Sequence, residues 1–212
     1  MKFKIETSDM VFVFVLSFLL GVLIILLSTF LIIRDIGFYE AEAEKNKVYD
    51  KFWNPYEAKV AYENLVNYFN DRDKLFNTYD KSEVKHLADV KKLIKNLKEG
   101  FLILSVLLFV VLSFLWRKKY RYLWMIFVGG FLSVVLIFLF LYIFSVFDFS
   151  TLFDGFHRIF FAEGSWVFDE HSFLIKLFPI GLFVDGLMRI LYYSLFFGFV
   201  VLSIGILVKK TF

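Results

Sequence analysis

The chain has 212 residues, of which 59% are hydrophobic and 22% aromatic, and its mean hydropathy of +0.69 exceeds that of an ordinary water-soluble domain. This composition excludes an intrinsically disordered chain, which would be poor in apolar residues. The net charge of +3 is too small to suggest a nucleic-acid-binding protein, and the absence of cysteine excludes disulfides, cysteine-ligated metals and a cysteine acyl-enzyme.

Four long apolar runs organise the chain. Residues 11–33 carry no charge, and these 23 residues are enough to cross a bilayer core as a helix. The run is too long for a cleaved signal peptide and no small-residue cleavage site follows it. Further runs cover residues 101–116, 123–147 and 187–208, and only the last contains a charge, Arg189, which can extend to the headgroups. The sequence therefore predicts an α-helical membrane protein with four transmembrane helices.

Short basic segments set the expected orientation. Lysines precede the first run, a basic loop separates the second from the third, and Lys209 and Lys210 follow the fourth. By the positive-inside rule these segments and both termini are cytoplasmic. The expected order is residues 1–33 (N-terminus and first helix), 34–100 (extracytoplasmic), 101–116 (second helix), 117–122 (cytoplasmic loop), 123–147 (third helix), 148–186 (extracytoplasmic) and 187–212 (fourth helix and C-terminus).

The two outer segments predict a small extracytoplasmic cap. Residues 54–57, Asn-Pro-Tyr-Glu, are typical of a helix start and predict a helix over about residues 55–70. A capping-box-like start at residues 80–83 predicts a second helix to about residue 98, apolar on one side and carrying Lys85, Lys92 and Lys95 on the other. Short strands are also possible over residues 160–173, which are rich in β-forming residues.

The position of His86 relative to the bilayer depends on how the second outer helix meets the second apolar run. In a straight helix, His86 would stand about 21 Å above Gly100, whereas a bend near Lys98 would keep it close to the lipid surface. The shorter outer segment is dense in phenylalanine and tryptophan, as expected at a membrane interface. This density places His157 near headgroup level.

The candidate catalytic residues are the three histidines, His86, His157 and His171, which all fall in the outer segments. Histidine is the commonest general base at neutral pH, although a single histidine is more often a surface or packing residue. A zinc site with Glu163, Asp169 and Glu170 would lack the usual short ligand spacing. Ser165 is not in a nucleophile elbow, and a coupled transporter would need ionisable groups inside its spans. We therefore expect no metal and no cofactor.

Two stretches resemble the signatures of a bacterial four-span membrane family. Residues 83–90, Glu-Val-Lys-His-Leu-Ala-Asp-Val, resemble its E-x-x-H-hydrophobic-x-D-V segment. Residues 155–161, Gly-Phe-His-Arg-Ile-Phe-Phe, and residues 164–169, Gly-Ser-Trp-Val-Phe-Asp, resemble its second signature, and a Leu-Phe-Pro element follows at residues 177–179. The chain is therefore similar, over nearly its full length, to the lipoprotein intramolecular transacylases (Lit) of Gram-positive bacteria.

The resemblance implies a multi-pass enzyme of the bacterial cell membrane with an extracytoplasmic active site. Its substrate would be a diacylglyceryl-modified lipoprotein, met within membrane lipid. The sn-2 acyl chain would move from glycerol to the α-amine of the N-terminal cysteine and give the lyso form. The family's essential histidines map onto His86 and His157, and the resemblance does not assign their individual roles.

Elementary chemistry is compatible with this reaction and suggests supporting residues. Neutral His86 could accept the proton of the attacking amine, while His157 donates to the oxyanion or the leaving oxygen with help from Arg158. The order could be reversed. Glu83 and Asp89, each three residues from His86 on one helix, could orient its ring, or only cap and solvate the helix. We expect the two histidines within about 10 Å of each other, so that one substrate group fits between them. The alternative is a non-enzymatic membrane scaffold or accessory subunit.

Overall fold

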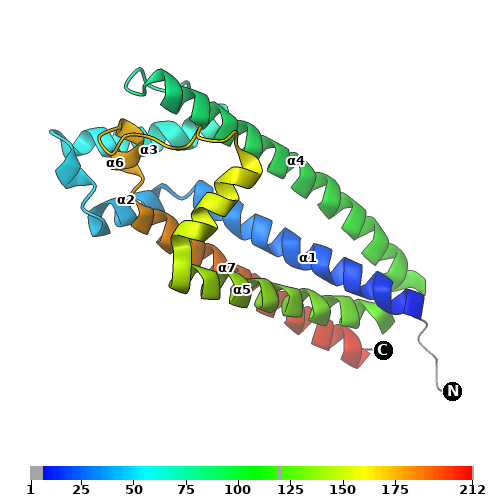
Figure 1. Cartoon of the computed structure of the whole chain (residues 1–212). Coiled ribbons are helices and arrows are strands. Elements are labelled where there is room, and N and C mark those ends of the chain that lie inside the picture. Colours follow the sequence, from blue (N-terminus) through cyan, green and yellow to red (C-terminus); the bar gives the residue numbers. More distant parts are fainter. Residues whose placement is uncertain (1–6, 119–120, 212) are drawn as a thin grey trace. The chain divides into compact units, whose positions relative to one another are not determined.

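The computed structural model describes residues 7–118 and 121–211, and the regular structure in these ranges is entirely helical. The elements are α1 (Thr7–Ile33), α2 (Ile36–Lys45), the 3₁₀ helix η1 (Tyr49–Lys51), α3 (Pro55–Phe69), α4 (Lys81–Lys118), α5 (Arg121–Phe160), α6 (Phe173–Leu177) and α7 (Ile180–Thr211) (Figure 1). Lys2, Lys4 and Lys119, on which the expected orientation partly depends, lie outside the described residues.

The short strands considered for residues 160–173 do not occur in the described chain. Residues 166–168 belong to a stretch of turns and irregular backbone, and Phe173 begins α6. The reason is local capping: the Ser172 hydroxyl oxygen accepts a hydrogen bond from the Ile175 N–H at 3.3 Å, which favours a helix start over an extended strand.

Within the described residues, four helices are long and apolar enough to cross a membrane: Thr7–Ile33, Lys81–Trp116, Tyr122–Phe160 and Ile180–Lys210. The prediction of a four-span, α-helical membrane protein is confirmed. Because about 20 residues suffice to cross the hydrocarbon core, α4 and α5 are each longer than one span. We take their apolar runs, residues 101–116 and 123–147, as the membrane-spanning segments, so residues 81–97 and 149–160 lie outside them.

Helix α4 joins the second outer helix to the second apolar run without a break. The helical backbone continues from Lys81 through Lys98 to Lys118. The physical reason is that this stretch contains no proline, and Gly100 alone does not interrupt helical hydrogen bonding.

Helix α5 is broken at Asp148, one residue after the third apolar run ends. Asp148 has non-helical angles, with φ −158° and ψ 75°. Its carboxylate accepts hydrogen bonds from the Thr151 N–H at 3.0 Å and the Thr151 hydroxyl at 2.6 Å, as an N-cap residue does. Residues 149–160 therefore form a separately capped helical segment, and this segment carries His157.

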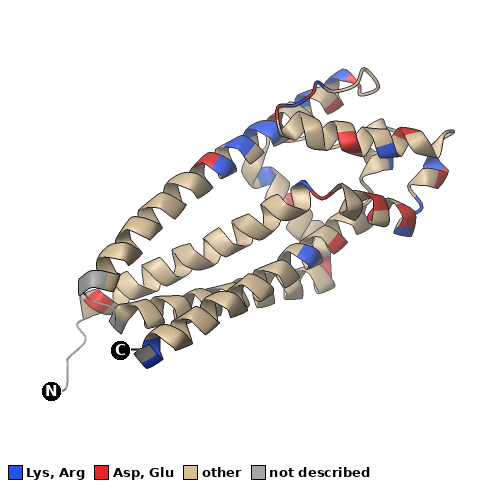
Figure 2. Cartoon of the chain, turned by 180° about the vertical axis from the view of Figure 1, so that it is seen from behind, with Lys and Arg blue, Asp and Glu red and all other residues tan. Residues whose placement is uncertain are grey.

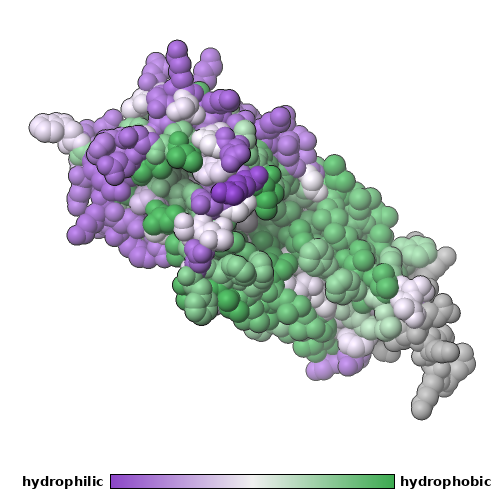
Figure 3. All heavy atoms as spheres, viewed as in Figure 1, coloured by the Kyte–Doolittle hydropathy of each residue, from purple (hydrophilic) through white to green (hydrophobic). Residues whose placement is uncertain are grey.

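The chain divides into two compact units, which we describe separately. Unit 1 lies within Met1–Thr29, Lys98–Ile143 and Ile190–Phe212, and unit 2 consists of Phe30–Leu97 and Phe144–Arg189. Apolar side chains gather on the visible face of unit 1, whereas hydrophilic ones gather over unit 2 (Figure 3). The core of unit 1 draws on all four long helices through Val13, Leu16, Leu23, Leu108, Leu115, Tyr122, Leu123, Ile126 and Val208.

Close helix packing in unit 1 depends on glycine. A Cβ atom added at Gly129 of α5 would lie 2.8 Å from the Cβ of Ser17 on α1, closer than real side chains approach. A Cβ added at Gly21 of α1 would lie 2.8 Å from the Cβ of Ser133 on α5. Small residues therefore let α1 and α5 approach closely, as is common between membrane helices.

The substitution Gly129→Ala should lower the stability of unit 1, because overpacking costs about 1–3 kcal/mol. The measurement is the thermal unfolding midpoint of the purified protein in detergent. Gly100→Ala is the matched control, since a Cβ there meets no atom of the described residues within 4 Å. Equal midpoints for the two variants would show that this close approach does not contribute.

Unit 2 is built on α3, whose predicted start and length are confirmed. The Asn54 Oδ1 atom accepts a hydrogen bond from the Tyr56 N–H at 3.0 Å, and Pro55 occupies the first helical turn. The buried Tyr62 hydroxyl donates to the Leu177 carbonyl, and the Phe178 ring packs against Tyr62 at 5.7 Å. These contacts hold Leu177 and Phe178, at the end of α6, against α3.

Candidate active site

Within unit 2 the structure brings His86 of α4 and His157 of α5 together. Their ring centroids are 6.1 Å apart with an interplanar angle of 24°, as predicted within 10 Å. Each histidine is only 7% exposed. The two rings are therefore close enough to act on one small group held between them.

Aromatic rings surround this pair. Phe161 and Phe168 lie 5.1 and 5.5 Å from the His86 ring, and Phe153 and Trp166 lie 4.1 and 5.5 Å from the His157 ring, centroid to centroid. Sequence reasoning assigned these aromatics to the membrane interface and missed their packing on the histidines. The high number of aromatic residues in this segment was the available signal. The direction in which the side chains beyond residue 160 point depends on the turns that follow α5.

One hydrogen bond fixes the state of the His157 ring. Its Nδ1 atom lies 2.7 Å from the Phe153 carbonyl oxygen. Because a carbonyl oxygen only accepts, Nδ1 carries the hydrogen and donates it. In the neutral ring, Nε2 therefore holds the free lone pair and can accept a proton.

The surroundings keep both imidazoles neutral. Burial lowers the pKa of His86 from 6.5 to about 4; the neighbouring His157 lowers it further, and Asp89 opposes the shift. Burial also lowers the pKa of His157, against the opposing effects of the Phe153 carbonyl and Asp154. A protonated ring would be poorly solvated in this enclosure. Near pH 7 the pair therefore consists of two uncharged rings.

The structure gives Glu83 different partners from the expected histidine. Glu83 is 1% exposed; its Oε2 accepts the Asp80 N–H at 2.8 Å, and its Oε1 accepts the Leu174 N–H at 2.7 Å. The Nδ1 atom of His86 is buried and has no hydrogen-bond partner among the residues that the structure describes. The expectation that Glu83 orients His86 is therefore corrected: unpaired backbone N–H groups at two helix starts take both carboxylate oxygens. Glu83 ties the start of α4 to α6.

Replacing Glu83 by Gln should destabilise the protein by about 1–3 kcal/mol. The NH2 group of Gln would face one of the two backbone N–H groups from which Glu83 now accepts a hydrogen bond, and two donors cannot form a hydrogen bond. The thermal unfolding midpoint in detergent measures this effect. Glu163→Gln is the matched control at an exposed position. If both variants unfold at the wild-type temperature, the two hydrogen bonds do not stabilise the fold.

The other candidate residues lie differently. Asp89 is half-buried and affects the pKa of His86 by its charge, while Arg158 is exposed and has no ion-pair partner in the described part of the chain. The His171 side chain is 81% exposed and lies 3.5 Å from Glu170. Among the described residues, no three His, Asp or Glu side chains form a group that could hold a metal ion.

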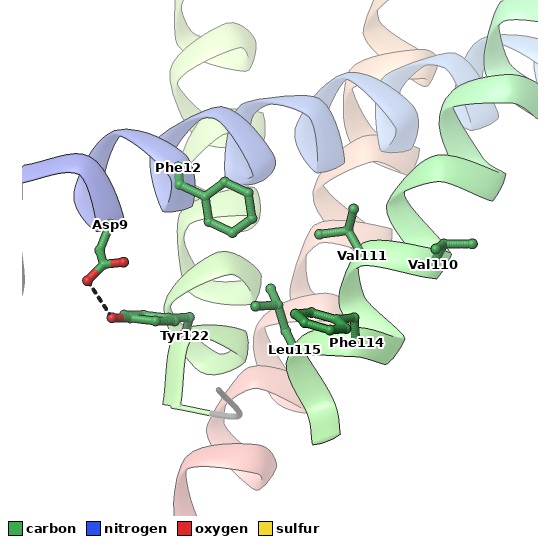
Figure 4. Close-up of a pocket in the computed structure, with 7 residues that line it drawn as sticks. All are labelled: Asp9, Phe12, Val110, Val111, Phe114, Leu115 and Tyr122. Atoms are coloured by element: carbon green, nitrogen blue, oxygen red, sulfur yellow. Dashed lines mark hydrogen bonds between the residues drawn. The ribbon is translucent and has the colours of Figure 1, made fainter. Parts of the chain in front are cut away.

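A separate cavity occurs in unit 1, with a volume of about 390 Å³. Phe12, Val110, Val111, Phe114 and Leu115 line it together with Asp9 and Tyr122, whose hydroxyl donates to the Asp9 carboxylate at 2.7 Å (Figure 4). No histidine lines this cavity, so it is not part of the candidate site.

The sequence profile of the lipoprotein intramolecular transacylase Lit family matches residues 14–183, which include both histidines. The chain belongs to this family. The Lit resemblance that the two signature stretches indicated is thereby confirmed, and the name of the family describes an acyltransferase.

Relatives agree with membership in the Lit family. An uncharacterised protein of Aquifex aeolicus is 33% identical over 128 residues, which cover 60% of this chain and only 56% of that protein. The membrane-integral lipoprotein intramolecular transacylase Lit of Bacillus cereus matches with a TM-score of 0.84 and 20% identity, covering 96% of this chain and 97% of its own. A variant of it with a histidine replaced by alanine matches at 0.78, with 19% identity and coverage of 96% and 94%. Because these sequence identities are low, the structural similarity shows that the chain shares the Lit fold.

Proposed function

We propose that this chain is an intramolecular transacylase that moves the sn-2 acyl chain of a diacylglyceryl-modified lipoprotein to the α-amine of its N-terminal cysteine, which yields the lyso form. Membership in the Lit family supports the reaction class. The observation that carries the proposal is the pair of buried, neutral histidine rings 6.1 Å apart in an aromatic enclosure. Ester aminolysis needs an acceptor for the amine proton and a donor to the carbonyl oxygen, and two neutral imidazoles supply both.

The reaction balances without a further reactant. The amine nitrogen attacks the ester carbonyl carbon, and a tetrahedral oxyanion forms. The carbon–oxygen bond to glycerol then breaks as the new amide bond is retained, and the proton lost by the nitrogen passes to the glycerol oxygen. Because amine and ester belong to one lipid head, holding them together lowers the barrier substantially.

His157 is assigned the role of general base. Its Nδ1–H is engaged with the Phe153 carbonyl, so the Nε2 lone pair is the atom that accepts the amine proton and then delivers it to the glycerol oxygen. The packing of Phe153 on the same ring, at 4.1 Å, limits ring rotation. This assignment reverses the roles in the hypothesis from the sequence, in which His86 was the base and His157 the donor.

His86 is assigned the role of neutral N–H donor to the oxyanion. Its pKa of about 4 makes it a weak base, and an uncharged imidazole still carries one N–H. A donor that is already positioned and poorly hydrated stabilises a developing negative charge effectively. We assign Asp89 and Arg158 only electrostatic support, since in the described part of the chain neither forms a hydrogen bond or ion pair with the rings, and Asp89 acts on the pKa of His86 by its charge.

The enzyme is a multi-pass membrane protein, and we propose that its site faces the extracytoplasmic side with both termini in the cytoplasm. The described basic residues Lys209 and Lys210 follow the last span, as the positive-inside rule requires for a cytoplasmic end. The substrate lipoprotein and the surrounding membrane lipid are the partners that this placement implies.

The test uses purified protein and a synthetic peptide with an S-diacylglyceryl N-terminal cysteine. Tandem mass spectrometry should locate one acyl chain on the α-amine and one on glycerol after incubation with wild-type protein alone. A non-enzymatic scaffold or accessory subunit would leave the diacyl peptide unchanged. That result would overturn the proposal.

The pH profile follows from the lowered histidine pKa values. A substrate α-amine has a pKa of about 7.7–8.0, so the rate should rise with pH up to about 8 as the amine loses its proton. Because the pKa of each histidine lies below 6.5, both rings stay neutral while the amine titrates. A plot of log(kcat/KM) against pH should therefore keep a slope of about one between roughly pH 6.5 and 7. A slope clearly above one in this range would show that a histidine titrates at or above its ordinary pKa.

A further inference from the structure

Helix α4 carries a basic face outside the histidine site. We use this name for Lys81, Lys85, Lys91, Lys92, Lys95 and Lys98. At 100° per residue these six side chains fall within an arc of about 140°, while Glu83, His86, Leu87 and Ile94 are buried on the other side. Figure 2 shows blue residues following one another along this part of α4.

Protein carboxylates leave much of this charge unneutralised. Lys91 forms an ion pair with Asp71 at 2.7 Å and lies 4.2 Å from the centre of the Tyr68 ring. Lys92 and Lys95 are exposed, and neither has an ion-pair partner in the described residues. At this end of the helix Asp89 borders the basic face, and the exposed Glu99 lies within its arc, one turn after Lys95, so Glu99 offsets one of the six positive charges. The basic face therefore keeps a net positive charge.

The positions of Lys92 and Lys95 in α4 indicate what this positive charge meets. Lys95 and Lys92 precede Gly100 by five and eight residues, which is about 7.5 and 12 Å along the helix axis. The apolar run of residues 101–116 then follows on the same helix. Residues three apart on a helix are neighbours, so both ammonium groups can reach one phosphate group.

We propose that Lys92 and Lys95 bind the headgroup phosphates of anionic phospholipids where α4 enters the membrane. Flexible lysine side chains extend readily to phosphates at a membrane surface. Each such lysine strengthens binding to an anionic surface by about fivefold at moderate salt. This inference does not depend on the acyl-transfer proposal, because it concerns retained lipid and not turnover.

The test measures which lipids stay bound to the purified protein in nanodiscs of equal phosphatidylcholine and phosphatidylglycerol. Native mass spectrometry should show at least fivefold preference for phosphatidylglycerol in the wild type, and the preference should shrink in 0.5 M salt. K92Q/K95Q should remove most of it, while K92R/K95R should retain it. K51Q/K74Q is the matched control, because it removes two exposed lysines of unit 2 that do not belong to α4.

Several outcomes would overturn the proposal. One is a wild-type protein without preference between the two lipids. Another is a preference that K92Q/K95Q and K51Q/K74Q reduce equally, which would indicate a general charge effect. Loss of the preference in 10 mM inorganic phosphate at constant ionic strength would indicate a site for free phosphate. If K92Q/K95Q fails to fold, the wild-type lipid preference and its behaviour in K92R/K95R decide the question.

Discussion

Replacement of His157 by Ala should reduce the rate of lyso-lipopeptide formation by about 10²–10⁴-fold, the usual contribution of a general base. The loss should appear in kcat, because the proton transfer occurs only in the transition state. His157→Gln, which preserves most of the side-chain volume, should be equally inactive. Initial rates measured by mass spectrometry on the synthetic diacylglyceryl peptide check this expectation.

The matched control is His171→Ala. His171 is the third histidine of the chain, and its side chain is 81% exposed beside Glu170. This variant should keep wild-type activity. Comparable losses for His171 and His157, or a His157→Gln variant that remains active and folded, would remove His157 from the proposed mechanism.

Variants of His86 should distinguish an N–H donor from a base. His86→Ala should lower kcat by about 10²–10³-fold, as loss of one oxyanion donor does. His86→Asn restores a neutral N–H donor and should recover at least tenfold of that loss. His157→Asn should recover nothing over His157→Ala, since an amide cannot accept the amine proton.

Thermal unfolding midpoints of the four variants serve as the control for folding, because both rings are buried. The opposite pattern would be recovery of activity in His157→Asn and none in His86→Asn. That result would indicate that His86 is the base and His157 the hydrogen-bond donor. Rescue at neither position would mean that His86 does more than donate a hydrogen bond.

Much of the fold is predictable because its signals are local. Uncharged runs long enough to span a bilayer mark the four helices, and the Asn54–Pro55 pair marks the start of α3. The end of the third run at Phe147 anticipates the break at Asp148, since a carboxylate followed three residues later by Thr151 forms a cap. The spacing of apolar residues does not show whether the second outer helix and the second apolar run form one continuous helix, because a helix that leaves the membrane can either continue or end there.

The candidate site is less predictable because its contacts join distant segments. The two histidines follow from their signature stretches, whereas the hydrogen bond from Leu174 to Glu83 links residues 91 positions apart. The carboxylate of Glu83 is adjacent to His86 in helical register, so its orientation toward backbone donors is visible only in the structure. The order of catalytic roles likewise depends on the Phe153 carbonyl, a backbone atom without any side-chain signature.

The central claim is direct transfer of an acyl chain within one lipid head, between two neutral histidines and without an acyl-enzyme. A crossover experiment tests it most directly. Purified wild-type protein receives a mixture of two diacylglyceryl peptides, one with deuterated acyl chains and an isotopically heavy peptide, the other unlabelled. We expect only fully heavy and fully light N-acyl products. Mixed products, with a light acyl chain on a heavy peptide, would contradict the claim.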